Sequence, residues 1–301
     1  MNARRYETPE AFKQALEMRL RRDTGDGIDM ARRRQVVVFE RLLARLFDGF
    51  GDAAILKGGL AVELRLARCR ATRDVDLRLD SAPDDLVARL RLLGRRDLGD
   101  CMTFEVEPDD AQPEIAAEGL RYGGHRFRVV CNIAGRPYAA PFGLDIAYGD
   151  ALCGEPDILR GNDLLQFAGV PPPNFRVYPI ASHLAEKIHA YTLPRERTNS
   201  RVKDLPDIAL LATVRELDAG HLRRAVATTF GFRGTHAPPT ALPGPPPSWE
   251  APYAAMAKSG RLPWGTLTAV VAAARAFIDP VLGGTDEAVW IPASWTWRPK
   301  A

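Results

Sequence analysis

The alternation of apolar and polar residues predicts helices at both ends of the chain and a strand-rich centre. Thr, Pro and Glu at 8–10 are typical of a helix start, and this helix is expected to reach about residue 21. Apolar residues at helical spacing predict a second helix over 29–48. A short apolar strand over 53–56 then leads through a Gly-Gly turn into an expected helix over 60–67.

The central segments have the shorter period of strands. Residues 74–79 alternate charged side chains with valine and leucine, which predicts a strand with one polar face. A helix is expected from Pro83 to about Leu93, followed by a strand near 104–106. The segments 125–133 and 138–148 flank Gly-Arg-Pro and are expected to form a hairpin.

Beyond residue 150 the pattern becomes helical. Helices are expected over 180–193, 203–217 and 264–279. The segment 237–247 contains six prolines and is expected to be a loop. This order predicts an α+β fold. We expect residues 1–170 to form a lobe with the strands and the N-terminal helices, and 171–301 to form a mainly helical lobe.

Composition excludes several classes of protein. The chain has 301 residues, of which 46% are apolar, and a formal charge of +3. No apolar run approaches the roughly 20 residues of a membrane span, and the N-terminus has no signal-peptide core. We therefore expect a cytoplasmic protein without a membrane partner. Its four cysteines are scattered, with no C-x-x-C pair, which argues against a zinc or redox site.

The positive charge is concentrated near the N-terminus. Residues 1–45 contain eleven Lys and Arg against seven Asp and Glu, and the densest part is Arg19, Arg21, Arg22 and 32–34. Such a patch could hold a phosphate backbone, or it could be the solvated face of a helix. A second basic segment lies at 195–203.

The candidate chemistry begins with two acidic residues. Asp74 and Asp76 stand two apart on the predicted strand, so they project from the same face. Paired carboxylates repel one another unless a cation lies between them, and Mg²⁺ prefers oxygen ligands. Asp145, within another apolar strand-like segment, is the candidate third carboxylate. The alternative is an exposed strand face with no ligand.

The preceding turn could hold the phosphates of a nucleotide. Gly58 and Gly59 let a backbone approach a ligand closely, and the helix that follows directs free N–H groups at an anion. Downstream, Lys187 lies off the apolar face of its helix, and a basic loop follows. Taken alone, that segment could equally be an ordinary amphipathic helix with a solvated loop.

Together these segments resemble the AbiEii/AbiGii toxin nucleotidyltransferases, which include the MenT-like toxins. The resemblance covers about residues 53–215 and rests on five segments in the family's order. These are Lys57-Gly58-Gly59-Leu60-Ala61-Val62-Glu63-Leu64, Arg70-Ala71-Thr72-Arg73-Asp74-Val75-Asp76-Leu77, Leu144-Asp145-Ile146, Ala185-Glu186-Lys187-Ile188-His189-Ala190 and Arg201-Val202-Lys203-Asp204-Leu205-Pro206-Asp207.

The resemblance implies a polymerase-β-like minimal nucleotidyltransferase lobe, a helical C-terminal lobe and an active site between them. It implies a toxin, paired with a cognate antitoxin, that transfers NMP from an NTP to an RNA acceptor such as the 3′ end of tRNA. Its implied catalytic residues are Asp74, Asp76, Lys187 and Asp204, and its implied Mg²⁺ ligands are Asp74, Asp76 and Asp145. The implied nucleotide contacts are Lys57, Gly58, Gly59, Thr72, Arg73 and Lys187, with Arg70 a further candidate.

Some roles stay open at this stage. Many nucleotidyltransferases have serine after the first glycine of the turn, whereas Gly59 stands here, so a hydroxyl contact would come from Thr72 or be absent. Asp204 could orient Lys187 or touch the nucleotide, and Asp145 could hold metal or act as a base. The alternative functions are a small-molecule (antibiotic-type) or protein nucleotidyltransferase, or a non-catalytic nucleic-acid-binding module. Metal-dependent nucleotide incorporation separates the enzymes from the module.

Overall fold

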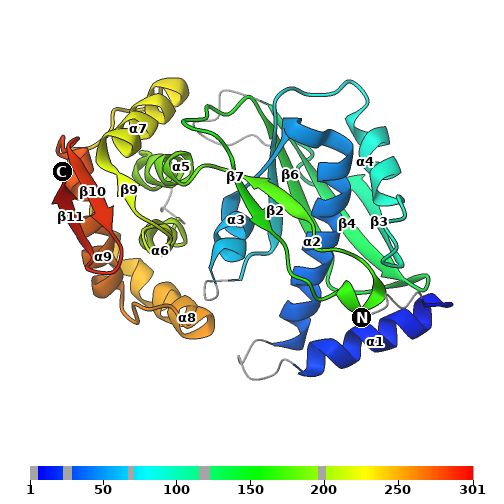
Figure 1. Ribbon diagram of the computed structural model, residues 1–301. Helices are drawn as coiled ribbons and strands as arrows, with labels where there is room; N and C mark the ends of the chain where they lie inside the picture. Colours follow the sequence, from blue (N-terminus) through cyan, green and yellow to red (C-terminus); the bar gives the residue numbers. More distant parts are fainter. Residues whose placement is uncertain (1–5, 23–28, 67–70, 115–122, 196–200, 301) are drawn as a thin grey trace.

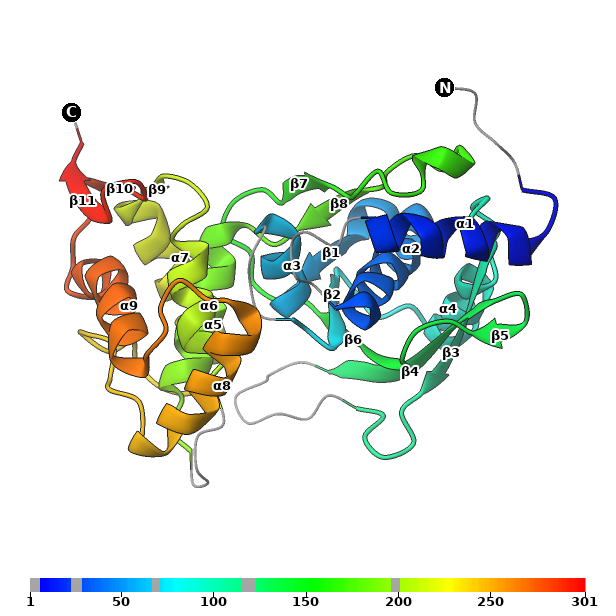
Figure 2. The same cartoon turned by 90° about the horizontal axis from the view of Figure 1, so that it is seen from below.

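The computed structural model describes residues 6–22, 29–66, 71–114, 123–195 and 201–300. Two lobes lie side by side, one built on a large sheet and one mainly of helices (Figures 1 and 2). Helix α1 and strand β11 lie at opposite ends of the molecule in both views.

One mixed sheet forms the centre of the first lobe. Its strands are β1 Ala54–Lys57, β2 Asp74–Leu79, β3 Met102–Pro108, β4 Gly124–Ile133, β5 Arg136–Pro137, β6 Phe142–Tyr148, β7 Asp157–Arg160 and β8 Asn174–Val177. Their order is β3-β4-β6-β2-β1-β8-β7, with β5 paired to β4. The pairs β2–β6 and β1–β8 are parallel and the others antiparallel, so the sheet brings distant segments of the chain together.

The remaining elements complete the two lobes. The first lobe contains α1 Pro9–Arg22, α2 Met30–Phe50, α3 Gly58–Arg65 and α4 Leu86–Gly94. The second contains α5 Ile180–Thr192, α6 Asp204–Leu211, α7 Ala219–Arg233, α8 Glu250–Gly260 and α9 Leu267–Leu282. A small sheet of β9 Leu217–Asp218, β10 Ala288–Ile291 and β11 Thr296–Pro299 joins these helices, in the order β11-β10-β9. Short 3-10 turns lie at Gly51–Ala53, Gln166–Ala168 and Pro247–Trp249.

The first core determines which face of β2 is polar. Val75 and Leu77 are fully buried in one cluster with Leu42 and Leu46 of α2. Because successive side chains of a strand point to opposite faces, this packing directs Asp74, Asp76 and Arg78 to the other side of the sheet. The expected strand with one polar face is therefore present.

A second hydrophobic core lies in the helical lobe and includes one residue that belongs to the first lobe. Val62 of α3 belongs to this second cluster, whose other members begin at Ile180. The first cluster ends at Val177, and β8 still belongs to the large sheet. We therefore propose that the lobes divide between Val177 and Ile180, a few residues beyond the division expected after residue 170.

Several predicted elements differ in extent from those observed. Within the expected helix over 203–217, the observed helix α6 ends at Leu211, and residues 212–216 lead into β9. The expected helix from Pro83 begins at Leu86, after a turn. The second arm of the predicted hairpin begins only at Phe142, and the short strand β5, Arg136–Pro137, lies within the predicted turn. Strands β7, β8, β10 and β11 and helices α7 and α8 were not predicted; each strand has only four residues, too few to show a period.

Candidate functional site

A row of four charged residues crosses the polar face of the large sheet. Lys57 of β1 is paired with Asp76 of β2, Asp76 with Asp145 of β6, and Asp145 with Arg126 of β4. Directly paired residues on neighbouring strands lie on the same face. The sheet thus sets two carboxylates side by side with a cation at each end of the row. Asp74 lies on the same face, two residues before Asp76.

Two glycines leave the space that these carboxylates occupy. A Cβ on Gly58 would lie 1.9 Å from the Asp76 carboxylate, and Gly58 also has a positive φ of 68°. A Cβ on Gly143, the partner of Asp74 on β6, would lie 2.7 Å from the Asp74 carboxylate. The sequence predicts that the Gly-Gly turn binds phosphate. The turn also leaves room for the Asp76 side chain, which a larger residue at position 58 would displace. Gly143 was not among the residues predicted for the site.

The charge on Asp76 is unfavourable in this arrangement. Its removal from water raises the pKa of Asp76 to about 6, and Asp145 and Asp74 add to this effect, while Lys57 and Lys187 oppose it. Lys187 comes from α5 of the other lobe. The carboxylate row is thus electrostatically coupled to a cation on each lobe, and a bound cation would relieve the remaining repulsion.

Asp145 is held by a guanidinium group. Arg126 donates to both oxygens of Asp145, with Nε–Oδ1 and Nη2–Oδ2 distances of 2.8 Å. This ion pair raises the pKa of Arg126. Each carboxylate oxygen keeps a further acceptor position, because Arg126 occupies one on each. The sequence analysis did not anticipate Arg126, since its partner lies 19 residues away on another strand.

The donor set fits a hard divalent cation completed by its substrate. Within the described ranges, no three Asp, Glu, His or Cys side chains are grouped closely enough to form a metal cage. Mg²⁺ characteristically binds through one or two carboxylates and keeps waters and substrate phosphates as its other ligands. Asp74 and Asp76 provide such a pair. The assignment of Mg²⁺ and of Asp145 as a ligand stays a prediction.

Lys57 is turned toward the second lobe. Its ammonium donates to Asp150, which follows β6, and to Glu186 of α5 at 3.2 Å. Burial alone would lower the pKa of Lys57, but Glu186 and Asp150 outweigh it and raise the pKa. Arg233 of α7 reaches Asp150 at 3.3 Å and Glu186 at 3.2 Å. Lys57 is therefore part of an ion-pair network between the lobes, a role the sequence analysis did not consider.

Lys187 is oriented by two aspartates of α6. Its Nζ lies 2.7 Å from the Asp207 carboxylate and 3.6 Å from that of Asp204. The Asp207 side chain is fully buried, whereas that of Asp204 is 10% exposed. The geometry supports an orienting role for Asp204, the first of the two alternatives, and identifies Asp207 as the nearer partner. Asp207 was within the quoted motif but not among the predicted site residues.

Thr72 is buried in a different set of contacts. Its backbone N–H donates to Glu63 of α3, and its carbonyl accepts from Arg32 of α2 at 2.5 Å. Arg32 also donates to Glu63, with Nε–Oε1 at 2.9 Å. The Thr72 hydroxyl lies 3.5 Å from the carbonyl of Asp74. Thr72 thus lies beside the carboxylate strand, and its contact with a nucleotide stays a prediction.

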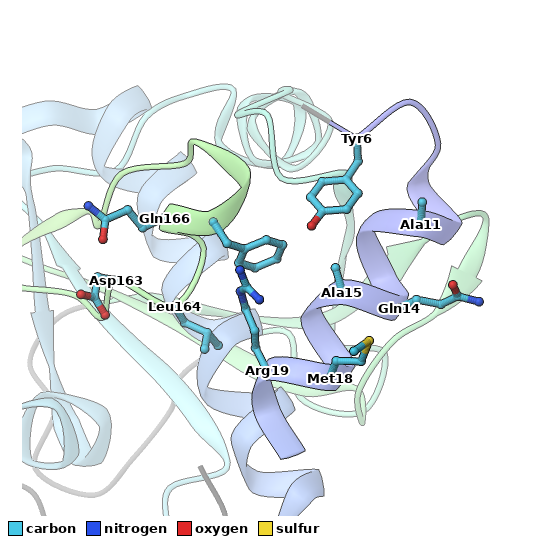
Figure 3. A pocket seen from close by; sticks show the side chains of 10 residues that line it. Tyr6, Ala11, Gln14, Ala15, Met18, Arg19, Asp163, Leu164 and Gln166 are labelled. Carbon is cyan, nitrogen blue, oxygen red and sulfur yellow. The ribbon is translucent and has the colours of Figure 1, made fainter. Parts of the chain in front are cut away.

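Three arginines of the N-terminal basic patch, Arg19, Arg32 and Arg34, make contacts within the protein. Arg34 makes a two-pronged ion pair with Glu17 of α1, at 2.7 and 2.6 Å, and Arg32 is held as described above. Arg19 lies over the ring of Phe167, 3.9 Å from its centroid, beside a cavity of about 990 Å³ between α1 and residues 163–167 (Figure 3). Arg32 and Arg34 are thus engaged in ion pairs within the protein, and phosphate binding by residues 32–34 stays a prediction.

Some predicted residues lie outside the described ranges. These are Arg70, the cysteine at position 69 and residues 196–200 of the second basic segment. The other cysteines, Cys101, Cys131 and Cys153, are free thiols. None of the helices in the described part of the chain is both long and apolar enough to cross a membrane.

The fold is that of the nucleotidyltransferase toxins. MenT4, a nucleotidyltransferase toxin from Mycobacterium tuberculosis H37Rv, matches with a TM-score of 0.56 and 18% sequence identity, over 96% of this chain and 93% of that one. JHP933 from Helicobacter pylori matches with a TM-score of 0.43 and 15% identity, over 68% of this chain and 81% of that one. No curated protein sequence matches the chain.

The sequence also matches the family model of the AbiEii nucleotidyltransferase toxins of type IV toxin–antitoxin systems, over residues 41–269. The chain belongs to this family. It is a toxin-type nucleotidyltransferase, with a nucleotide as substrate and an antitoxin as partner. The resemblance found in the sequence and the α+β fold class are both confirmed.

Proposed function

We propose that the protein transfers an NMP group from an NTP to the 3′ end of an RNA, most specifically a tRNA, in a Mg²⁺-dependent reaction. The observation that carries this proposal is the polar sheet face, where Asp74 and Asp76 lie beside Asp145 on the adjacent strand and Lys187 of the other lobe acts electrostatically on Asp76. A binding module would gain nothing from carboxylates that repel one another.

In the proposed reaction, the 3′ oxygen of the acceptor forms a bond to the α-phosphorus, and the bond to the pyrophosphate oxygen breaks. Asp74 and Asp76 would hold Mg²⁺, which supplies charge neutralisation for the phosphates when bound. Asp145 would assist as a ligand or accept the proton of the attacking hydroxyl through an oxygen position that Arg126 leaves open. Backbone groups at Gly58 and Gly59 would contact the triphosphate.

Lys187 would stabilise the charge that develops on the phosphates. Asp207 and Asp204 hold its ammonium, so it needs little reorganisation during the reaction. Thr72 remains a predicted nucleotide contact. Lys57 forms ion pairs with Asp150 and Glu186. If it also contacts the nucleotide, it would do so while it keeps these ion pairs.

The test is incubation of the protein with total RNA and each α-labelled NTP in turn, with and without Mg²⁺, followed by gel separation. We expect label in the tRNA band with one NTP and none without a divalent cation. Label on a protein or a small molecule, with none on any RNA, would show that the acceptor is wrong while the metal chemistry stands. No transfer to any acceptor would contradict the enzymatic assignment.

A further inference from the structure

A cavity of about 470 Å³ opens beside the carboxylate row, on the side of β6 and β4. Its charged lining residues are Arg73, Asp74, Asp109, Arg126, Arg128 and Asp145, three arginines and three aspartates. The cavity therefore contains two of the predicted metal ligands together with three cations.

The three arginines differ in whether they form an ion pair. Arg126 is engaged with Asp145. Arg73 and Arg128 are exposed, and neither forms an ion pair with the part of the chain that the structure describes. Asp109, the remaining acid, accepts from the backbone N–H groups of Ala111 and Gln112 at 2.9 and 3.0 Å. Within the described ranges, the guanidinium groups of Arg73 and Arg128 thus line the cavity without an ion pair, although Arg128 acts electrostatically on Asp109.

The strand register fixes where these guanidinium groups stand. On β6, Gly143 is paired with Asp74 of β2 on one side and with Arg128 of β4 on the other. Only the glycine therefore separates Arg128 from Asp74 across the sheet. Arg73 directly precedes Asp74. Arg73 and Arg128 thus both stand beside the Asp74–Gly143 pair. Two cations at separate positions suit successive phosphates of a polynucleotide better than one isolated anion.

The chemistry determines which substrate would occupy the cavity. In phosphoryl transfer the attacking and leaving oxygens lie roughly in line, on opposite sides of the phosphorus. Under the proposed function, the triphosphate lies over Gly58, Gly59 and Lys187, on the β1 side of the carboxylates. The attacking hydroxyl must then approach from the β6 side, where the cavity lies.

We propose that this cavity is the acceptor subsite, where Arg73 and Arg128 bind phosphates of the RNA strand next to its reactive 3′ end. This inference rests on the proposed function and reassigns Arg73 from the nucleotide to the acceptor. Arg126 orients Asp145 at the inner end of the cavity and is a positioning residue. A strand bound here places its terminal hydroxyl beside the carboxylates.

The test compares the wild type with the double variant Arg73→Gln/Arg128→Gln in a binding assay that requires no transfer. The probe is a short single-stranded RNA carrying fluorescein, and its anisotropy is measured over a range of salt concentrations. Arg160→Gln is the matched control, because Arg160 is also exposed and without an ion pair in the described ranges, but lies on β7 at the other edge of the sheet. Binding of each NTP is measured separately by calorimetry.

We expect the double variant to lose RNA affinity by roughly 10-fold for each contact, and its salt dependence to fall by about 1.4 in the logarithmic slope. NTP binding and the Arg160→Gln control should be unchanged. Equal RNA affinity and salt slope in the wild type and the double variant would overturn the subsite, even if the wild type labels RNA. Loss of NTP binding in place of RNA binding would also overturn it, because the cavity would then be the triphosphate site. A wild type that binds RNA through these arginines but transfers no nucleotide would contradict the proposed reaction alone.

Discussion

Asp76 lies between two other carboxylates and two ammonium groups, one from each lobe. Its pKa of about 6 lies above the ordinary value for an aspartate, so its charged form is disfavoured in the folded protein without a bound cation. The same residue is therefore a cost to stability and a candidate metal ligand. Functional sites commonly combine these two properties.

We predict that Asp76→Asn abolishes nucleotide transfer while it keeps or raises folding stability. An aspartate with a raised folded-state pKa costs nothing below the unfolded pKa and costs most above the folded pKa, so the gain should grow from about pH 4 and be complete above about pH 6. Transfer from labelled NTP and thermal unfolding at about pH 8 measure the two effects. The control is Asp84→Asn, an exposed carboxylate outside the row, which should change neither. Full activity of Asp76→Asn would contradict the metal-site proposal.

Glu40 is a second acid with an unfavourable charge, far from the carboxylate row in sequence. It is 4% exposed in α2 and accepts from the backbone N–H of Asn162 at 3.0 Å. Burial raises its pKa to about 7, although the Asn162 hydrogen bond and Arg41 act against this. The carboxylate thus ties the segment after β7 to α2 at an electrostatic cost.

We predict that Glu40→Gln removes a pH-dependent loss of stability. Because the folded pKa is raised, the wild-type side chain costs nothing below about pH 4.5 and progressively more until about pH 7. Glutamine keeps an acceptor for Asn162 and carries no charge. Urea unfolding at about pH 5 and about pH 8 should show the variant gaining roughly 2–3 kcal/mol over the wild type between the two conditions. An equal pH dependence in both proteins would show that Glu40 is not the group that titrates.

At the scale of elements, the start of β2 is fixed by contacts with two helices. Arg32 of α2 and Glu63 of α3 both bind the backbone of Thr72, two residues before Asp74. The basic character of α2 thus serves to place the carboxylate strand. A helix face that looks solvated in the sequence is, at this point, a tie between elements.

We predict that Arg32→Lys weakens folding by about 1–3 kcal/mol and lowers nucleotide transfer, because lysine cannot make the two-pronged contact with Glu63. The charge is kept, so the salt dependence of RNA binding should stay the same. Chemical unfolding and the salt slope of RNA anisotropy separate the two effects. Arg22→Lys, at the exposed end of α1, is the control and should behave like the wild type. A changed salt slope with unchanged stability would support the phosphate-patch interpretation for Arg32.

At the scale of the whole molecule, the lobes are joined by buried charges. Lys57 and Arg233 face Asp150 and Glu186, with each side chain at most 15% exposed. Val62 of α3 adds an apolar contact with the second core. The position of Lys187 relative to the carboxylate row therefore depends on how these groups hold the lobes together.

We predict that Lys57→Met destabilises the protein by about 3–5 kcal/mol, because it leaves buried carboxylates without one of their cations. The double variant Lys57→Met/Glu186→Gln should recover part of this loss. Urea unfolding measures both, and Lys258→Met, an exposed lysine of α8, is the matched control. If Lys57→Met keeps its stability and only NTP binding weakens, Lys57 is a nucleotide contact, as the motif implied.

The sequence by itself determined the features that depend on neighbouring residues. The alternation over 74–79 determined that Asp74 and Asp76 share a face, because a strand repeats every two residues. The apolar pattern around Asp145 correctly indicated a strand, and the order of motifs indicated the family.

Only the tertiary structure decided the partners of these side chains. Arg126 meets Asp145 across 19 residues, Lys57 meets Asp150 across 93, and Lys187 lies nearer to Asp207 than to Asp204. Strand register and the packing of the lobes set these distances, and neither leaves a local period in the sequence. The candidate residues of the site could thus be identified in the sequence, whereas the groups that orient them depend on contacts between distant segments.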